Sequence, residues 1–218
     1  MLYFLKWLAN KMTQGLTIAG QLLMLLTSLW MIKTWQPKDE SPGWYAAAFC
    51  SGLLITSFSA SALMAHVIDL TPMYWFEQLA FYAAFPLLSF VLLALAFKMN
   101  WPKEAWGRIL LGVCGIYYLC QQTQNLSYLL TVSALISSFT MAALLLNKAS
   151  GICMKQANLT LSVAAFSSLI FVLHNASSHV NMNSVAQDLA AQWPIELALG
   201  LLLAAINRTF VLKLKAQT

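Results

Sequence analysis

Seven stretches of mostly apolar residues run along the chain, and short polar segments separate them. Each stretch approaches the roughly 20 residues that a helix needs to cross the hydrocarbon core of a bilayer. Pro86 lies inside the third stretch and predicts a kink there. The pattern predicts an all-α fold, an integral membrane bundle of seven transmembrane helices. The predicted spans cover residues 15–35, 43–68, 72–97, 106–122, 126–147, 157–179 and 190–212.

The composition indicates that the lipid bilayer surrounds most of the chain. Hydrophobic residues make up 60% of the 218 residues and charged residues only 9%, whereas an average soluble domain carries roughly 25% charge. A soluble protein of this length would lack the polar surface that it needs. The basic residues stand singly between apolar runs instead of forming a patch, so no nucleic-acid partner is expected. Protein partners are left open.

Lysine and arginine residues predict the direction in which the chain crosses the membrane. Two of the twelve, Lys6 and Lys11, map to one side of the bundle, and ten map to the other side. Because basic residues are enriched in cytoplasmic loops, we expect the N-terminus outside, the C-terminus inside and a short basic cytoplasmic tail at 213–218. The small size favours a bacterial inner membrane. The ten residues are Lys33, Lys38, Lys98, Lys103, Arg108, Lys148, Lys155, Arg208, Lys213 and Lys215.

Residues 1–14 precede the seven-helix domain, which covers residues 15–212. Apolar side chains of this segment fall on one helical face, whereas Lys6, Asn10 and Gln14 fall on another. This pattern is typical of an amphipathic helix that lies flat at the membrane interface. The alternative is an ordinary basic segment that flanks the first span.

Ionisable residues collect at the end of the bundle that faces outside in this topology. All three histidines and four of the seven acids map there. Ionisable groups at a membrane boundary or inside a bundle are rare and often functional. No other feature of the sequence points to chemistry. These residues are His66, His174, His179, Asp69, Glu77, Asp188 and Glu196.

Spans two and three meet at a tight turn at this end. Ser59, His66 and Asp69 share one helical face of span two through spacings of three and four residues. Glu77 lies more than one turn inside span three, where an isolated carboxylate requires a partner, and His66 is the expected one. The structural alternative is a packing face that ends in a polar His and Asp, with a purely structural ion pair.

The last two spans contribute the remaining ionisable residues. His174 and His179 end span six and point about 140° apart on a regular helix. His174 is the deeper of the two, and the alternative for His179 is a simple headgroup contact. Glu196 follows Pro194 in the first turn of span seven, where a helix N-terminus stabilises a negative charge.

These residue types predict a zinc site. Catalytic zinc typically takes three His or carboxylate ligands and leaves one position for water. Asp69 or Glu196 would orient a ligand or act as general base, so that the bound water attacks an ester or amide bond near a lipid headgroup. The candidate ligands are His66, Glu77, His174 and His179.

The layout resembles the CREST group of seven-span membrane hydrolases, which includes alkaline ceramidases and haemolysin III-type proteins. That group places a Ser and a His late in one span, an acid early in the next and a His pair in a late span. The resemblance implies zinc-dependent hydrolysis of a lipid-like amide or ester, with Ser59 in the catalytic set. Ala62 stands where the group has its Ser, and the His pair is more widely spaced here. The matching residues are Ser59, Ser61, His66, Glu77, His174 and His179.

Two other functions remain open. His66 and His174 could be axial ligands of a haem, or the polar end could serve a non-enzymatic sensor, transporter or partner subunit. The sequence contains no nucleotide-binding loop, metalloprotease helix or serine-hydrolase elbow. We attribute four Asn-x-Ser/Thr triplets to chance in a chain rich in these residues. They begin at Asn125, Asn158, Asn175 and Asn207.

Overall fold

Helices form every regular element that the structure describes, which confirms the all-α prediction. Five stretches are long and apolar enough to cross a membrane, so the chain is a multi-pass integral membrane protein. They are Gln14–Thr34, Gly43–Ile68, Phe76–Ala96, Tyr128–Leu145 and Ile195–Leu212. This computed structural model describes residues 2–36, 42–68, 74–97, 99, 101–123, 125–146, 154–179 and 195–215.

Spans four and six of the sequence prediction are helices that are not among the five candidate membrane spans. Span four is α5 (Lys103–Gln122), which carries three charged residues in its first two turns and two glutamines at its end. Span six is α7 (Met154–His179), whose described apolar part, Ala157–Leu173, is shorter than the other candidate spans. Helix length and composition in the described ranges therefore establish five spans.

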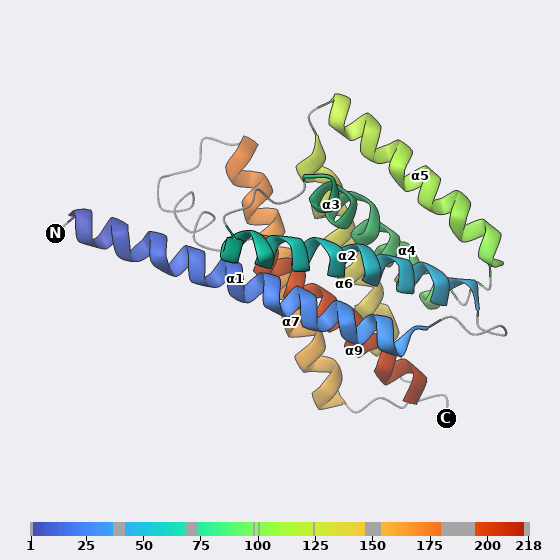
Figure 1. The fold of residues 1–218 in the computed structure, drawn as a ribbon. Helices are drawn as coiled ribbons and strands as arrows, with labels where there is room; N and C mark the ends of the chain where they lie inside the picture. Colours follow the sequence, from blue (N-terminus) through green and yellow to red (C-terminus); the bar gives the residue numbers. More distant parts are fainter. Residues whose placement is uncertain are drawn as a thin grey trace.

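The chain begins with one long helix, α1 (Leu2–Thr34). The sequence separates an interfacial helix at residues 1–14 from the first span, but the structure joins residues 2–14 to that span without a break (Figure 1). The helix continues because none of its 33 residues is a proline, and a glycine such as Gly15 does not by itself end a helix.

The third predicted span contains an irregular turn. It consists of α3 (Tyr74–Leu79), the π-helical segment η1 (Ala80–Ala84) and α4 (Phe85–Ala96). The backbone N–H of Phe85 donates to the carbonyl of Ala80, five residues earlier. Pro86 has no N–H, and its ring would meet the carbonyl four residues before it in a regular helix. The widened turn accommodates the ring. The sequence predicts a kink at Pro86, and the structure has a π-helical turn just before it.

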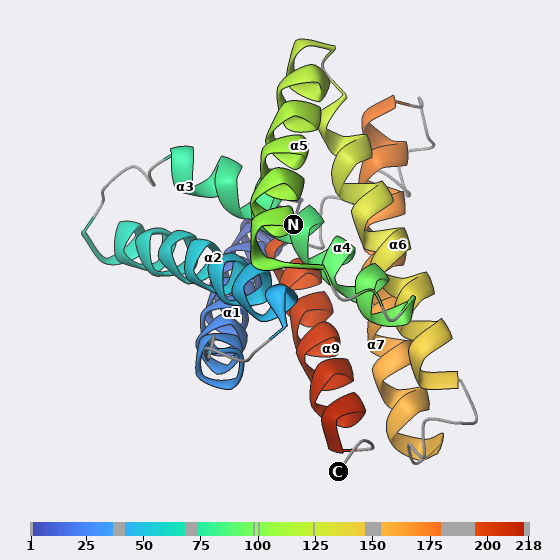
Figure 2. The ribbon, with the colours of Figure 1, turned by 90° about the vertical axis from the view of Figure 1, so that its right-hand side faces the viewer.

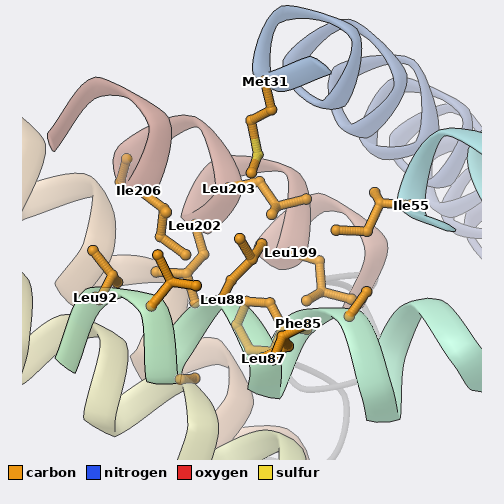
Figure 3. Packing of buried hydrophobic residues seen from close by; sticks show 14 of the residues in the cluster. Met31, Ile55, Phe85, Leu87, Leu88, Leu92, Leu199, Leu202, Leu203 and Ile206 are labelled. Atoms are coloured by element: carbon orange, nitrogen blue, oxygen red, sulfur yellow. The ribbon is translucent and has the colours of Figure 1, made fainter. Parts of the chain in front are cut away.

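Helix α1 packs along two neighbours, α2 (Gly43–Ile68) and α9 (Ile195–Lys215). It runs parallel to α9, because Gly20 lies against Leu197 and Trp35 bonds to Asn207 further along. Helix α7 packs against α9 and α6 (Leu126–Leu146), and α4 packs against α6 and α2. Side chains of α4 and α9 point toward one another in the centre of the bundle, where Met31 and Ile55 join them (Figure 3).

Hydroxyl groups link the helices within this apolar core. Ser89 of α4 donates to the carbonyl of Ser133 of α6 at 3.0 Å and pairs with the hydroxyl of Ser137 at 2.8 Å. The hydroxyls of Ser138 and Ser168 join α6 to α7 in the same way. Small residues and hydroxyl pairs of this kind let helices approach closely where lipid supplies no hydrophobic driving force.

Candidate functional site

Four helix ends lie on one side of the bundle. Helices α2 and α7 end on this side, and α3 and α9 begin on it, but these ends do not all touch: α2 and α3 lie on the left of Figure 2 and the end of α7 lies at its upper right. The predicted site residues therefore belong to the same end of the molecule, as the alternating direction of the helices requires. The described residues of this end divide into a carboxylate pair, an exposed histidine and a buried serine.

The carboxylate pair consists of Glu77 on α3 and Glu196 on α9. Glu77 lies in the first described turn of α3, and Glu196 lies in the first turn of α9. Both side chains are half-buried, and they are close enough for their negative charges to repel each other. A helix N-terminus stabilises each carboxylate, but neither forms an ion pair with a described residue. The pair therefore concentrates negative charge between two helices.

The depth of Glu77 in its span stays a prediction. The sequence places it more than one turn inside span three, with His66 as its partner, and the residues just before Tyr74 lie outside the described part of the chain. No ion pair joins His66 to Glu77 in the described part of the chain. Glu196 is instead near enough to Glu77 for the two negative charges to repel each other.

Helix α1 lies against the backbone of α9 at Glu196 and Leu197. An alanine Cβ at Gly20 would lie 2.5 Å from the backbone nitrogen of Leu197 and 2.8 Å from the carbonyl carbon of Glu196. The next residue, Gln21, is only 6% exposed, and its Oε1 has no hydrogen-bond partner among the described residues. A buried acceptor without a donor is costly. Sequence reasoning missed Gln21, although a glutamine inside an apolar span is a signal for it.

Ser59 and His66 occupy different environments on α2. Ser59 is fully buried, and its hydroxyl donates to the carbonyl of Ile55 at 2.8 Å, one turn earlier on the same helix. His66 is exposed in the last turn of α2, where a positive charge suits the end of a helix. The ring of His66 is therefore available to a ligand, whereas the Ser59 hydroxyl proton is already donated.

Three predicted site residues lie wholly or partly outside the described part. Asp69 is outside it entirely, and so are the side chains of His174 and His179, whose backbone forms the last turns of α7. Asp188, of the same ionisable group, also lies outside it. Among the described residues, no group of three His, Cys, Asp or Glu side chains is arranged to hold a metal. The zinc ligand set and the haem ligands therefore stay predictions.

A second group of functional-type side chains surrounds Trp35 at the opposite end of the bundle. Trp35 Nε1 donates to Asn207 Oδ1 at 3.1 Å, and both residues are fully buried. The ring of Trp35 packs against those of Trp44, Tyr45 and Phe210, with centroids 5.0–5.4 Å apart. Sequence reasoning assigned Asn207 only to a chance triplet. Its burial shows a structural role between α1 and α9.

Comparison with known protein families, with curated proteins and with solved structures finds no match for this chain. The fold and the site define the class: an all-helical, multi-pass integral membrane protein with a pair of carboxylates at one end of its bundle. The resemblance to seven-span hydrolases therefore rests on the residues quoted above.

Proposed function

We propose that all seven predicted helices cross the membrane, with the N-terminus outside and the C-terminus in the cytoplasm of a bacterial cell. Ten of the twelve basic residues support this direction. The parallel course of α1 and α9 supports an odd number of spans, with the two termini on opposite sides of the membrane. In this orientation Glu77 and Glu196 face the outside.

The carboxylate pair carries the proposed function. We infer that Glu77 and Glu196 bind a positively charged species and that the protein is a transporter or sensor for it. Two repelling carboxylates in a partly desolvated place favour a bound cation, which removes the repulsion. Carboxylate oxygens are the ligands that hard cations prefer.

This function predicts a cation-dependent stability that the two carboxylates control. Calcium, sodium or methylammonium is titrated into the detergent-purified protein at constant ionic strength, and tryptophan fluorescence reports the midpoint of thermal unfolding. We expect at least one cation to raise the midpoint at low concentration. Glu77→Gln and Glu196→Gln should each weaken the apparent affinity about tenfold, which corresponds to about 1.4 kcal/mol.

The matched control is Glu104→Gln, at the opposite end of the bundle, where the carboxylate is exposed. This variant should keep the response of the unchanged protein. A response that survives unchanged in both Glu77→Gln and Glu196→Gln would exclude the pair as the cation site. A protein that no cation stabilises would exclude the proposed function.

The metal-dependent hydrolase is the second candidate, and the exposed ring of His66 favours it. It requires zinc on His66, Glu77 and His174, and hydrolysis of a lipid amide or ester. Elemental analysis of the purified protein tests it directly. The hypothesis predicts near-stoichiometric zinc that the His66→Ala, His174→Ala double variant loses.

The metal content of the double variant separates the alternatives. Iron with a Soret band, lost in the variant, would indicate haem in place of zinc. A protein without zinc or iron would overturn both metal hypotheses but leave the carboxylate pair as a site for other cations. Zinc that the double variant retains would exclude these two histidines as its ligands.

A further inference from the structure

Helix α3, which carries Glu77, lies at the edge of the bundle, on the left of Figure 2. Its six described residues run directly into η1, and it packs against η1 and α2. A helical segment this short is not stable alone. The position of Glu77 therefore depends on what holds α3 to the rest of the bundle.

The π-helical turn that follows α3 weakens its connection to α4. A helical carbonyl normally accepts from the N–H four or five residues further along the chain. For the carbonyl of Phe81, the first of these N–H groups, on Phe85, donates to Ala80, and the second position is Pro86, which has no N–H. Helices bend where a proline or a π turn interrupts their hydrogen bonds. Helix α4 alone therefore does not fix the direction of α3.

Tyr117 of α5 attaches α3 to the bundle through two contacts. Its hydroxyl donates to Gln78 Oε1 of α3 at 3.0 Å. Its ring stacks on that of Tyr82 in η1, with centroids 5.6 Å apart and the two planes 22° from parallel. All three side chains are half-buried, where a hydrogen bond is stronger than in water. One side chain thus contacts both sides of the junction between α3 and η1.

This contact bears on the carboxylate pair because Glu77 directly precedes Gln78 on the same short helix. Any tilt of α3 that separates Gln78 from Tyr117 also moves Glu77. The charges of Glu77 and Glu196 repel each other, so before a cation is bound they push α3 away from α9. The hydrogen bond to Gln78 opposes such a movement.

We propose that Tyr117 is a positioning residue of the carboxylate pair, and that its hydroxyl, through Gln78, holds α3 where Glu77 stays close to Glu196. The role in binding rests on the proposed cation function, whereas the position of α3 can be measured without a cation. A site held in its binding geometry loses less conformational entropy when its ligand arrives. Tyr117 therefore raises the cation affinity without contacting the cation.

Chemical cross-linking tests the position of α3 directly. Glu77→Cys and Glu196→Cys are combined in the full-length chain, whose four native cysteines are replaced by alanine, and a short bis-maleimide joins the two thiols in detergent micelles. Adding Tyr117→Phe should slow the reaction about fivefold, the effect of one hydrogen bond on an equilibrium. Phenylalanine keeps the ring contact with Tyr82 but cannot donate to Gln78.

Two controls make this result specific. Tyr118→Phe removes a hydroxyl from the next residue of α5, which is 58% exposed, and should leave the rate unchanged. Pairing Glu77→Cys with Glu104→Cys, at the opposite end of the bundle, gives the background rate. A rate that Tyr117→Phe does not lower, or that Tyr118→Phe lowers equally, would overturn the proposal. A Glu77→Cys, Glu196→Cys pair that reacts only at the background rate would also overturn it.

The cation titration gives a second test with both carboxylates in place. Tyr117→Phe and Gln78→Leu should each weaken the apparent affinity about fivefold, and the double variant should be no weaker than either one, because both remove the same hydrogen bond. If Tyr117 only stabilised the fold, Tyr117→Phe would lower the thermal midpoint without cation but leave the affinity and the cross-linking rate unchanged. If cross-linking slows but no cation stabilises the protein, the proposed function fails and the positioning role stands.

Discussion

Gly20→Ala is expected to separate α1 from α9 and to lower the free energy of unfolding by about 1–3 kcal/mol, the range of an overpacked interior site. The added Cβ would lie 2.5 Å from the backbone nitrogen of Leu197. A backbone atom cannot turn aside as the end of a side chain can. The opposing position is also tight, because an alanine Cβ at Gly200 would lie 3.1 Å from the carbonyl oxygen of Gly20.

Equilibrium unfolding in mixed detergent micelles, followed by tryptophan fluorescence, measures this effect. Gly15→Ala is the control on the same helix. Its Cβ meets nothing within 4 Å, so the better helix propensity of alanine should raise stability by up to about 1 kcal/mol. The two variants should therefore differ in sign. Equal effects would contradict the close crossing of α1 and α9.

Trp35→Ala is expected to be the most destabilising change at the opposite end of the bundle. Trp35 is fully buried among Trp44, Tyr45 and Phe210 and donates a hydrogen bond to Asn207. Truncation of a buried Trp costs about 3–5 kcal/mol in water-soluble proteins. The lower end of this range applies in a bilayer, where lost packing contributes but transfer from water does not.

Two further variants separate packing from hydrogen bonding at this site. Trp35→Phe keeps most of the ring contacts but leaves Asn207 Oδ1 without its donor, so a loss of about 1–2 kcal/mol is expected. Trp30→Ala is the control on the same helix, because Trp30 is 43% exposed, and it should change stability by less than about 0.5 kcal/mol. If Trp30→Ala destabilised as strongly as Trp35→Ala, the aromatic cluster would not be the anchor between α1 and α9.

The candidate site was predictable in its location but not in its contacts. The alternation of helix direction places His66, Glu77 and Glu196 at one end in any up-and-down bundle, and the described helices have this alternation. That these residues form one site stays a prediction. It paired Glu77 with His66 because those residues are close along the chain. The structure places Glu196 near enough to repel Glu77, although more than a hundred residues separate them. Proximity in sequence was the wrong guide, because helix neighbours far apart in the chain meet at this end.

The structural roles of Asn207, Gln21 and Gly20 could not be predicted from the sequence, because they too depend on contacts between helices that are distant along the chain. Asn207 belongs to a triplet that occurs by chance, and only the position of Trp35 shows why a buried amide is needed there. Gln21 and Gly20 look like minor interruptions of an apolar run until α9 is placed beside them. In each case the signal was a polar or small residue within a span, and its meaning depended on the helix that packs against it.

The sequence by itself determined the all-helical fold, the approximate helix boundaries and the membrane setting. Apolar stretches of bilayer length satisfy their backbone hydrogen bonds internally, so their course needs no tertiary information. Only the tertiary structure decided that α1 packs between α2 and α9, that Glu196 is near enough to repel Glu77, and that α5 lies at the edge with its glycines uncovered by the described residues. In a membrane the faces toward lipid and toward protein are similarly apolar, so hydropathy cannot name the neighbours of a helix. Close packing of small and polar side chains selects those neighbours, and that packing exists only once the helices have met.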